Sequence, residues 1–350
     1  MKRFTRMMLP AAAIIIFLSS CKKDNPSPSP SPTPAPIFAP ADFGFKVVGY
    51  FPYYRSVSAI PDTKFKMTNV VNYAFFTVTA SSGITLNSPS TFTAVIAKAK
   101  ANNAKIFMSV NGATADFKTS TATASARNTL IKTIMDNVRQ YTLDGVDIDW
   151  EFPTTSDGTD ILFTALMKEL SDSLHTNGKY YLTAAITPGK YAGSIRDAVQ
   201  TAVFNYADWF NVMVYDDFST TVPYKQHSDM ALVNASMNYW LTTRSMPASK
   251  YVLGVPGYGR PSGITQTNTI LTYSGILGQG GNPLSDSAVV TATGYPSPFT
   301  IYYNGQYTVK LKTMAAKQRG NGIMLWEKGQ DTNDNTSLLK AVCDTIGRPY

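Results

Sequence analysis

Cysteine, histidine and clustered positive charge are all scarce in this 350-residue chain, and each shortage excludes a class of protein. The two cysteines, Cys21 and Cys343, are too few for a fold held together by disulfides. With only two histidines, His175 and His227, the chain is a poor candidate for a zinc site or a Ser-His-Asp triad. Both histidines are expected at the surface. The formal net charge of +8 is diffuse, so nucleic acid is not an expected partner. No metal ion or cofactor is expected.

An export signal is indicated at the N-terminus. A basic start precedes an apolar run from Met7 to Leu18, which is too short to span a bilayer. The run ends in Leu18-Ser19-Ser20-Cys21, which resembles the lipobox of bacterial lipoproteins. The resemblance implies that residues 1–20 are removed and that Cys21 carries a lipid; a signal peptide with a chance cysteine is the alternative. We therefore expect a lipid-anchored protein of the bacterial cell envelope. The lipid is expected in the outer membrane, and the protein faces either the periplasm or the cell surface.

A tether and one large domain follow the signal. Residues 21–44 are rich in Pro and Ser and are predicted to be semi-extended, without a core. The chain from Phe45 to Tyr350 contains about 300 residues and no second linker, which suits a single domain. Cys343 lies in an apolar helical pattern and is expected to be a buried, inert thiol. We expect the domain to be monomeric.

Apolar runs alternate with helical patterns along this domain, and eight such alternations predict a (β/α)8 TIM barrel. The predicted strands are Lys46–Phe51, Asn69–Phe76, Lys105–Val110, Gly145–Trp150, Tyr181–Ile186, Trp209–Tyr215, Tyr251–Val255 and Gly322–Trp326. The predicted helices include Ser90–Asn102, Ala124–Tyr141, Asp160–Thr176, Asp229–Thr243 and Val309–Arg319. Residues 261–301, rich in Gly, Ser, Thr and Pro, are expected to form a loop excursion with short strands.

The fourth predicted strand carries three acidic residues at alternating positions. Because side chains alternate between the two faces of a strand, Asp147, Asp149 and Glu151 share one face. Like charges this close cannot all stay ionised in a low-dielectric site, so at least one pKa rises, which makes a general acid. In a TIM barrel the active site lies at the carboxyl ends of the strands, where Glu151 falls. Asp144 breaks the alternation and is expected to have a structural role.

A solvated strand face or a structural divalent cation is the alternative explanation for the three acids. A solvated edge is not normally followed by Trp-Glu-Phe-Pro, and a calcium loop is richer in Gly and Asn than this β-branched run. The spacing D-x-x-D-x-D-x-E before an aromatic residue and Pro153 closely resembles the signature of glycoside hydrolase family 18, the chitinase-like enzymes.

The resemblance implies a retaining, substrate-assisted hydrolysis of β-1,4 bonds in N-acetylglucosamine polymers, chitin or chito-oligosaccharides. Glu151 is then the general acid and base, Asp149 orients the substrate's acetamido group, and Asp147 exchanges a proton or hydrogen bond with Asp149. The segment Met213-Val214-Tyr215-Asp216 resembles the family's Met-x-Tyr-Asp, in which the Tyr hydroxyl contacts the acetamido carbonyl and the Asp contacts the sugar.

Further segments match the family on other strands. Trp326 ends the eighth strand like the Trp that floors the family's central sugar subsite. Tyr50 and Phe75 match aromatic wall positions, although simple barrel packing explains them nearly as well. Tyr258 and Arg260 resemble a segment that reaches the sugar chain.

The third strand departs from the family, which usually has Ser-x-Gly-Gly and then an aromatic residue. This chain has Ser109-Val110-Asn111-Gly112-Ala113, so one sugar platform is missing. Residues 261–301 are also too few for the family's usual α+β insertion, which predicts a reduced insertion and a shallower groove. Two other functions stay open: an endo-β-N-acetylglucosaminidase that cuts the chitobiose core of N-glycans, and a catalytically silent glycan-binding protein.

Overall fold

A computed structural model describes residues 38–219, 221–261, 271–296 and 298–350 of the chain. The expected export signal, Cys21 and most of the tether lie outside the described residues. Among the helices that are described, none combines the length and the apolar character needed to cross a bilayer.

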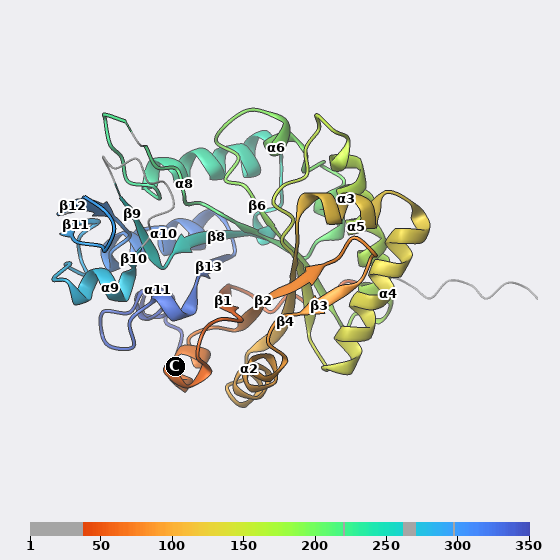
Figure 1. Ribbon diagram of the computed structural model, residues 1–350, viewed down its shortest axis with the longest axis horizontal. Coiled ribbons are helices and arrows are strands. Elements are labelled where there is room, and N and C mark those ends of the chain that lie inside the picture. Colours follow the sequence, from red (N-terminus) through yellow and green to blue (C-terminus); the bar gives the residue numbers. More distant parts are fainter. Residues whose placement is uncertain (1–37, 220, 262–270, 297) are drawn as a thin grey trace, which may run out of the picture. The chain divides into compact units, whose positions relative to one another are not determined.

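Eight parallel strands close into a barrel, which confirms the predicted TIM-barrel fold (Figure 1). They are β1 (Lys46–Pro52), β2 (Val70–Val78), β4 (Lys105–Asn111), β5 (Gly145–Ile148), β6 (Tyr181–Ile186), β7 (Trp209–Val212), β8 (Tyr251–Pro256) and β13 (Gly322–Trp326). Each strand pairs with its neighbours in this order, and β13 pairs with β1 to complete the ring. A short strand, β3 (Ile84–Leu86), adds to β2 in antiparallel fashion.

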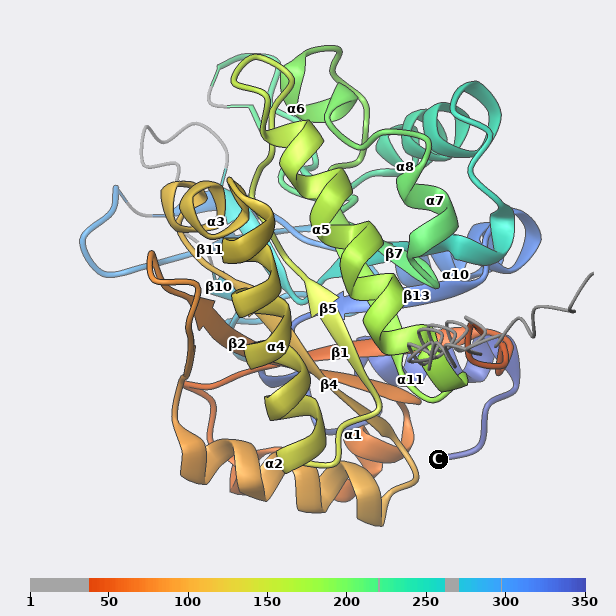
Figure 2. The same ribbon diagram turned by 90° about the vertical axis from the view of Figure 1, so that its right-hand side faces the viewer.

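Helices surround the barrel, as Figure 2 shows for α4 and α5. Those outside the region 261–301 are α1 (Asp62–Lys66), α2 (Pro89–Ala101), α3 (Thr114–Thr121), α4 (Ala124–Gln140), α5 (Thr159–Leu174), α6 (Ser194–Asp197), α7 (Val203–Tyr206), α8 (Met230–Met237), α10 (Gln306–Arg319) and α11 (Leu338–Ile346). Side chains cap several of them: Thr123 accepts a hydrogen bond from the first turn of α4, and Asp229 does the same for α8. The predicted helix Asp229–Thr243 is α8 followed by a π-helical stretch, Asn238–Thr243.

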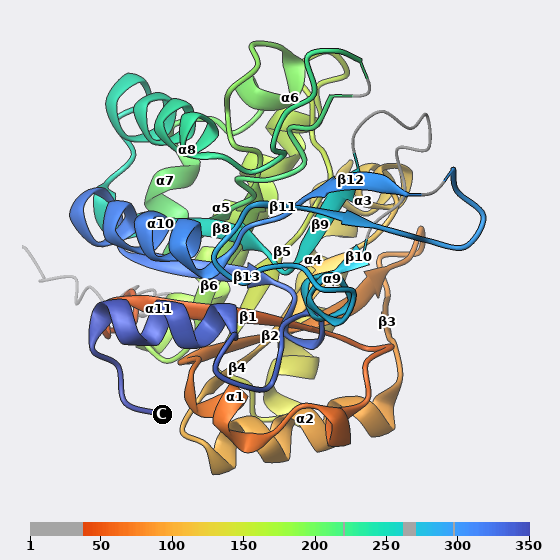
Figure 3. The same ribbon diagram turned by 90° about the vertical axis from the view of Figure 1, so that its left-hand side faces the viewer.

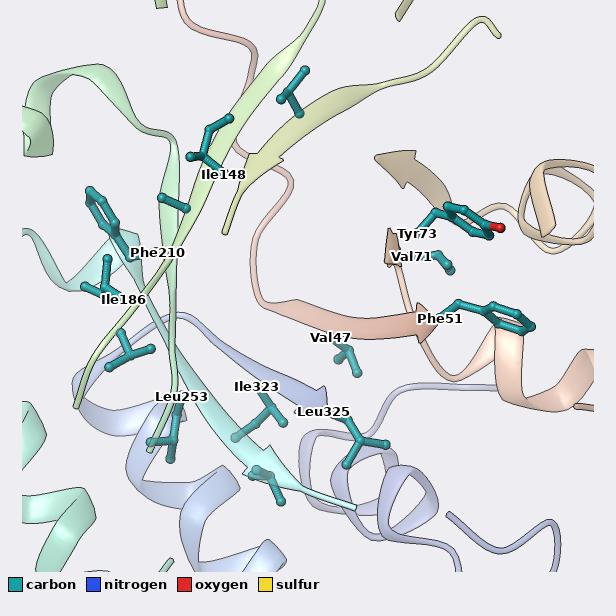
Figure 4. Packing of buried hydrophobic residues seen from close by; sticks show 14 of the residues in the cluster. Val47, Phe51, Val71, Tyr73, Ile148, Ile186, Phe210, Leu253, Ile323 and Leu325 are labelled. Atoms are coloured by element: carbon teal, nitrogen blue, oxygen red, sulfur yellow. The ribbon is translucent and has the colours of Figure 1, made fainter. Parts of the chain in front are cut away.

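The main core lies between the barrel strands and the helices. Alternate strand residues point outward into it, and Figure 4 shows Val47, Ile323 and Leu253 side by side on β1, β13 and β8. On β5, Val146 and Ile148 belong to this outer layer, so the residue between them faces the barrel interior.

The region 261–301 contributes to a small antiparallel sheet beside the barrel strands (Figure 3). Its strands are β9 (Tyr258–Pro261), β10 (Leu271–Thr272), β11 (Ser287–Val290) and β12 (Phe299–Tyr302), in the order β10-β9-β12-β11, and a short helix, α9 (Tyr273–Gly278), follows β10. Short strands were the expectation for this region; residues 262–270 and 297 lie outside the described part.

The expectation that both histidines are at the surface is wrong, because each forms buried hydrogen bonds. His175 is 4% exposed and contacts Ser171 and Asp208 through its two ring nitrogens. His227 is fully buried beside the barrel mouth. Cys343 is a buried free thiol, as expected, and burial raises its pKa to about 12, so it is unreactive at neutral pH.

Candidate active site

The three acids of β5 form a column along the barrel interior. Asp147 is fully buried, Asp149 is 5% exposed, and Glu151 is exposed at the mouth just beyond the strand. Asp144, at the opposite end, accepts a hydrogen bond from the backbone of Ile106 at 2.9 Å, which fits the structural role predicted for it.

Asp147 is held by four hydrogen-bond donors. Its Oδ2 accepts from the Tyr50 hydroxyl at 2.7 Å and the Ser109 hydroxyl at 2.8 Å, and its Oδ1 accepts from Thr183 at 2.6 Å and Asn211 at 3.0 Å. Ser109 and Thr183 stand directly beside Asp147 in the register of β4 and β6. Burial raises the pKa of Asp147 above its ordinary value, and the four donors offset part of this rise. Because each oxygen already receives two donors, a proton on Asp147 would displace one of them, so the ionised form fits this site.

Asp149 lacks such support. In the described part of the chain its Oδ1 is buried without a hydrogen-bond partner. Burial raises the pKa of Asp149 well above its ordinary value, and the charges of Glu151 above and Asp147 below raise it further. The column therefore keeps a proton at the level of Asp149 and Glu151, where a side-chain hydrogen bond joins the two carboxyls.

Glu151 has the electrostatics of a general acid. Although Glu151 reaches solvent at the mouth, partial desolvation by the pocket walls raises its pKa; the hydrogen bond with Asp149 lowers it, and the charge of Asp216 raises it. A carboxyl with a raised pKa keeps its proton at higher pH, which is the property a glycosidic oxygen needs from its acid.

A pocket of about 330 Å³ opens above the column. The predicted site residues that line it are Tyr50, Asp149, Glu151, Met213, Tyr215, Asp216, Tyr258 and Trp326. Phe152, Ala185, Thr187, Pro188 and Met324 also line it and were not predicted, because short or apolar side chains at strand ends carry no chemical signal. Asp147 lies below the pocket. No group of His, Cys, Asp and Glu side chains among the described residues is arranged to hold a metal ion.

Tyr215 lines this pocket and its hydroxyl is weakly bonded. Among the described residues, the hydroxyl makes a long contact with the sulfur of Met324, at 4.0 Å. Burial raises the pKa of Tyr215 well above its ordinary value, so the hydroxyl keeps its proton and is a donor for a ligand.

Three aromatic residues meet at one wall of the pocket. The ring of Trp326 lies 5.7 Å from that of Phe75 in a stacked arrangement and 5.3 Å from that of Tyr50 at a steep angle. Phe75 does not itself line the pocket, but it stacks on Trp326, which does. Tyr50 combines the two roles left open for it: it is 1% exposed, lines the pocket floor and donates to Asp147.

A further carboxylate, Asp216, lines the pocket beyond the three acids of the column. It has a left-handed backbone, with φ of 66°, and its Oδ1 accepts from the Tyr258 hydroxyl at 2.6 Å. Arg260 donates to both carboxylate oxygens at 2.8 Å. The nearby His227 ring and the donors Arg260 and Tyr258 together outweigh burial and hold the pKa of Asp216 well below its ordinary value, so it is ionised.

The substitution of Asn111 for a glycine on β4 does not require a left-handed backbone. Asn111 is a regular member of β4, paired with Thr77, and is absent from the non-glycine residues with positive φ. Gly112 lies against Val78, where an added Cβ would come within 3.2 Å of the Val78 side chain.

The candidate site is thus an acidic column that opens onto a partly aromatic pocket at the carboxyl ends of the barrel strands. The model of the family "Glycosyl hydrolases family 18" matches residues 46–331, and the chain belongs to this family. Chitinase 63 of Streptomyces plicatus is 29% identical over 233 residues, which are 57% of this chain and 38% of that protein. The chain thus spans well under half the length of that relative.

Two solved structures share the fold. A chitinase from Bacteroides thetaiotaomicron is 26% identical, with a TM-score of 0.73 over 87% of this chain and 99% of the other. A family 18 chitinase from Cycas revoluta, solved as a mutant in complex with (GlcNAc)4, is 23% identical, with a TM-score of 0.73 over 86% of this chain and 100% of the other.

Proposed function

We propose that this protein hydrolyses β-1,4 glycosidic bonds in N-acetylglucosamine polymers, either chitin or chito-oligosaccharides, with retention of anomeric configuration. The observation that carries the proposal is the column of Asp147, Asp149 and Glu151, which ends in a pocket shared with Tyr215 and Trp326. Family membership and the chitinase relatives support the same activity.

The first step follows from the position of Glu151 at the pocket. Protonated Glu151 gives its proton to the glycosidic oxygen as the bond to the anomeric carbon breaks. The carbonyl oxygen of the substrate's own 2-acetamido group forms the new bond to that carbon, giving an oxazolinium ion. Glu151, now ionised, then takes a proton from a water molecule while the water oxygen attacks the anomeric carbon. The bond between that carbon and the acetamido oxygen breaks, which opens the oxazolinium ring.

The other residues of the column and pocket support the internal nucleophile. Asp149 has a carboxyl oxygen without a protein partner, which suits an acetamido N–H, and its negative form stabilises the oxazolinium charge. We expect the Tyr215 hydroxyl, which lines the pocket, to donate to the acetamido carbonyl. Asp147, locked by its four donors, supplies a fixed charge that favours retention of a proton above it.

The pocket walls suit a short, soluble chain of sugars. Trp326 offers an aromatic surface for the apolar face of a pyranose, and Met213 and Asp216 flank the same space. The Cycas revoluta relative of the same fold was solved with (GlcNAc)4, which is the class of ligand proposed for this chain. Because the third strand lacks its usual aromatic residue, we expect soluble oligomers to be better substrates than crystalline chitin.

Product analysis tests this proposal. The purified protein is incubated in parallel with chitohexaose and with a high-mannose N-glycoprotein, and products are identified by mass spectrometry. Short chito-oligomers support a chitinase-type activity. A released glycan that leaves one N-acetylglucosamine on the protein moves the assignment to the endoglycosidase, and binding without any product points to a glycan-binding protein.

We also propose that a lipid on Cys21 anchors a monomeric enzyme in the cell envelope. Support comes from Leu18-Ser19-Ser20-Cys21 and from the Pro/Ser-rich segment that follows it. Radiolabelled palmitate should enter the wild-type protein but not a Cys21→Ala variant; equal labelling of the two would rule the anchor out.

A further inference from the structure

His227 is a buried residue that lies behind the catalytic pocket, in contact with two residues that line it, Asp216 and Tyr258. The backbone N–H of Asp216 donates to His227 Nδ1 at 3.2 Å, and the backbone N–H of Asp217 donates to the His227 carbonyl oxygen at 2.9 Å. His227 Nδ1 also lies 3.5 Å from Asp216 Oδ1. Two consecutive backbone groups are thus tied to one residue at the point where Asp216 adopts its left-handed conformation.

The segment that carries His227 is itself fixed from two sides. The Ser228 hydroxyl donates to the carbonyl oxygen of Val214 at 2.5 Å, and Lys312 of α10 donates to the Ser228 hydroxyl at 2.6 Å. The His227 ring lies against Tyr258, with ring centres 5.3 Å apart. The imidazole is therefore held in place independently of any ligand.

The protonation of His227 follows from its contacts. Because Nδ1 accepts from a backbone N–H, the ring is neutral, with its proton on Nε2, and Nε2 has no partner among the described residues. The charged or titratable groups that face it are Asp216, Arg260, Tyr258 and Lys312. Burial lowers the pKa of His227, and the positive charges of Lys312 and Arg260 lower it further, whereas Asp216 opposes this.

We infer that His227 is a positioning residue that fixes the backbone of Asp216, so that the Asp216 carboxylate stays beside Glu151. The inference rests on the proposed hydrolysis, in which Glu151 is the acid. Asp216 lines the same pocket as Glu151, Asp149 and Tyr215, and its negative charge helps Glu151 to keep a proton. His227 therefore affects the reaction indirectly, because it fixes the position of the negative charge on Asp216.

Two substitutions separate positioning from general stability. His227→Leu removes the acceptor at Nδ1 but keeps an apolar side chain in the buried site, whereas the amide oxygen of His227→Asn can take the place of Nδ1. We expect His227→Leu to lower kcat/KM on chitohexaose by about tenfold, the value of one lost hydrogen bond to a charged or fixed group, and His227→Asn to recover most of it. The alkaline limb of the pH profile of kcat/KM should move to lower pH in His227→Leu.

The Asp216→Asn variant tests whether the effect passes through Asp216. It should move the alkaline limb in the same direction, and the double variant His227→Leu/Asp216→Asn should be little worse than Asp216→Asn alone. His175→Leu is the matched control, the same change at the other buried histidine; it is expected to leave the limb where it is. An unmoved limb in His227→Leu, or losses that add in the double variant, would overturn the inference.

A crystal structure of His227→Leu gives a readout that does not depend on activity. If His227 positions Asp216, we expect Asp216 in this variant to leave its left-handed conformation or to turn its carboxylate. An Asp216 with unchanged backbone and side chain would overturn the inference. If the wild-type protein fails to cleave chitohexaose, the proposed function fails, whereas this structural result still decides whether His227 positions Asp216.

Discussion

Glu151→Gln is expected to lower kcat on chitohexaose by about a thousandfold or more while leaving the dissociation constant of the oligosaccharide within about threefold of the wild-type value. Glutamine has nearly the shape of glutamate but has no acidic proton to give to a glycosidic oxygen. The aromatic wall and Tyr215 stay in place, so binding persists. Steady-state kinetics and isothermal titration calorimetry measure the two quantities.

Glu169→Gln is a matched control for that substitution. Glu169 lies on α5 and pairs with Arg127 away from the pocket, so its replacement should leave kcat unchanged. Activity in Glu151→Gln at a tenth of the wild-type level would remove Glu151 from the role of acid.

Asp149→Asn is expected to have opposite effects on activity and stability. The amide can neither share a proton with Glu151 nor stabilise an oxazolinium ion, so kcat should fall by about a hundredfold or more. The same change removes a carboxyl that burial and two neighbouring acids disfavour in its charged form. At neutral pH the variant should therefore unfold at a temperature a few degrees higher than the wild type.

The pH dependence of this stability difference has a definite sign. Since folding raises the pKa of Asp149, its protonated form favours the folded state, and this contribution is complete at pH values below the ordinary carboxyl pKa. It is lost as the pH rises through the raised pKa of the folded protein. The amide does not titrate, so the advantage of Asp149→Asn should grow towards neutral pH and shrink on acidification. Melting temperatures of both proteins across this range test it; a variant that is less stable at neutral pH would contradict the account.

The barrel and the acidic column were predictable because both depend on local periodicity. Apolar runs of strand length separated by helical patterns are visible in the chain, and an alternation of acids along a strand places them on one face wherever that strand is found. The assignment of Tyr215, Asp216 and Trp326 to the site depended on the resemblance to glycoside hydrolase family 18, together with the rule that the carboxyl ends of barrel strands meet at one mouth.

The contacts between strands were not predictable from one strand at a time. Thr183 and Asn211 look like ordinary strand residues, and they become donors to Asp147 only through the register of neighbouring strands and the curvature of the barrel. The burial of His227 was not predicted either, because it depends on the left-handed conformation of its partner Asp216, which no local sequence pattern indicates. The contact of Arg260 with the sugar chain stays a prediction, whereas its binding to both oxygens of Asp216 was not predicted.

Inhibition by an N-acetylglucosamine-derived thiazoline tests substrate assistance most directly. This compound mimics the oxazolinium ion that forms when the acetamido group attacks the anomeric carbon. We therefore predict that it inhibits chitohexaose cleavage competitively. The inhibition should be weaker in Asp149→Asn and in Tyr215→Phe. An active wild-type enzyme that the thiazoline does not inhibit would contradict the central claim and would point to an enzyme carboxylate, Asp147 or Asp149, as an ordinary covalent nucleophile.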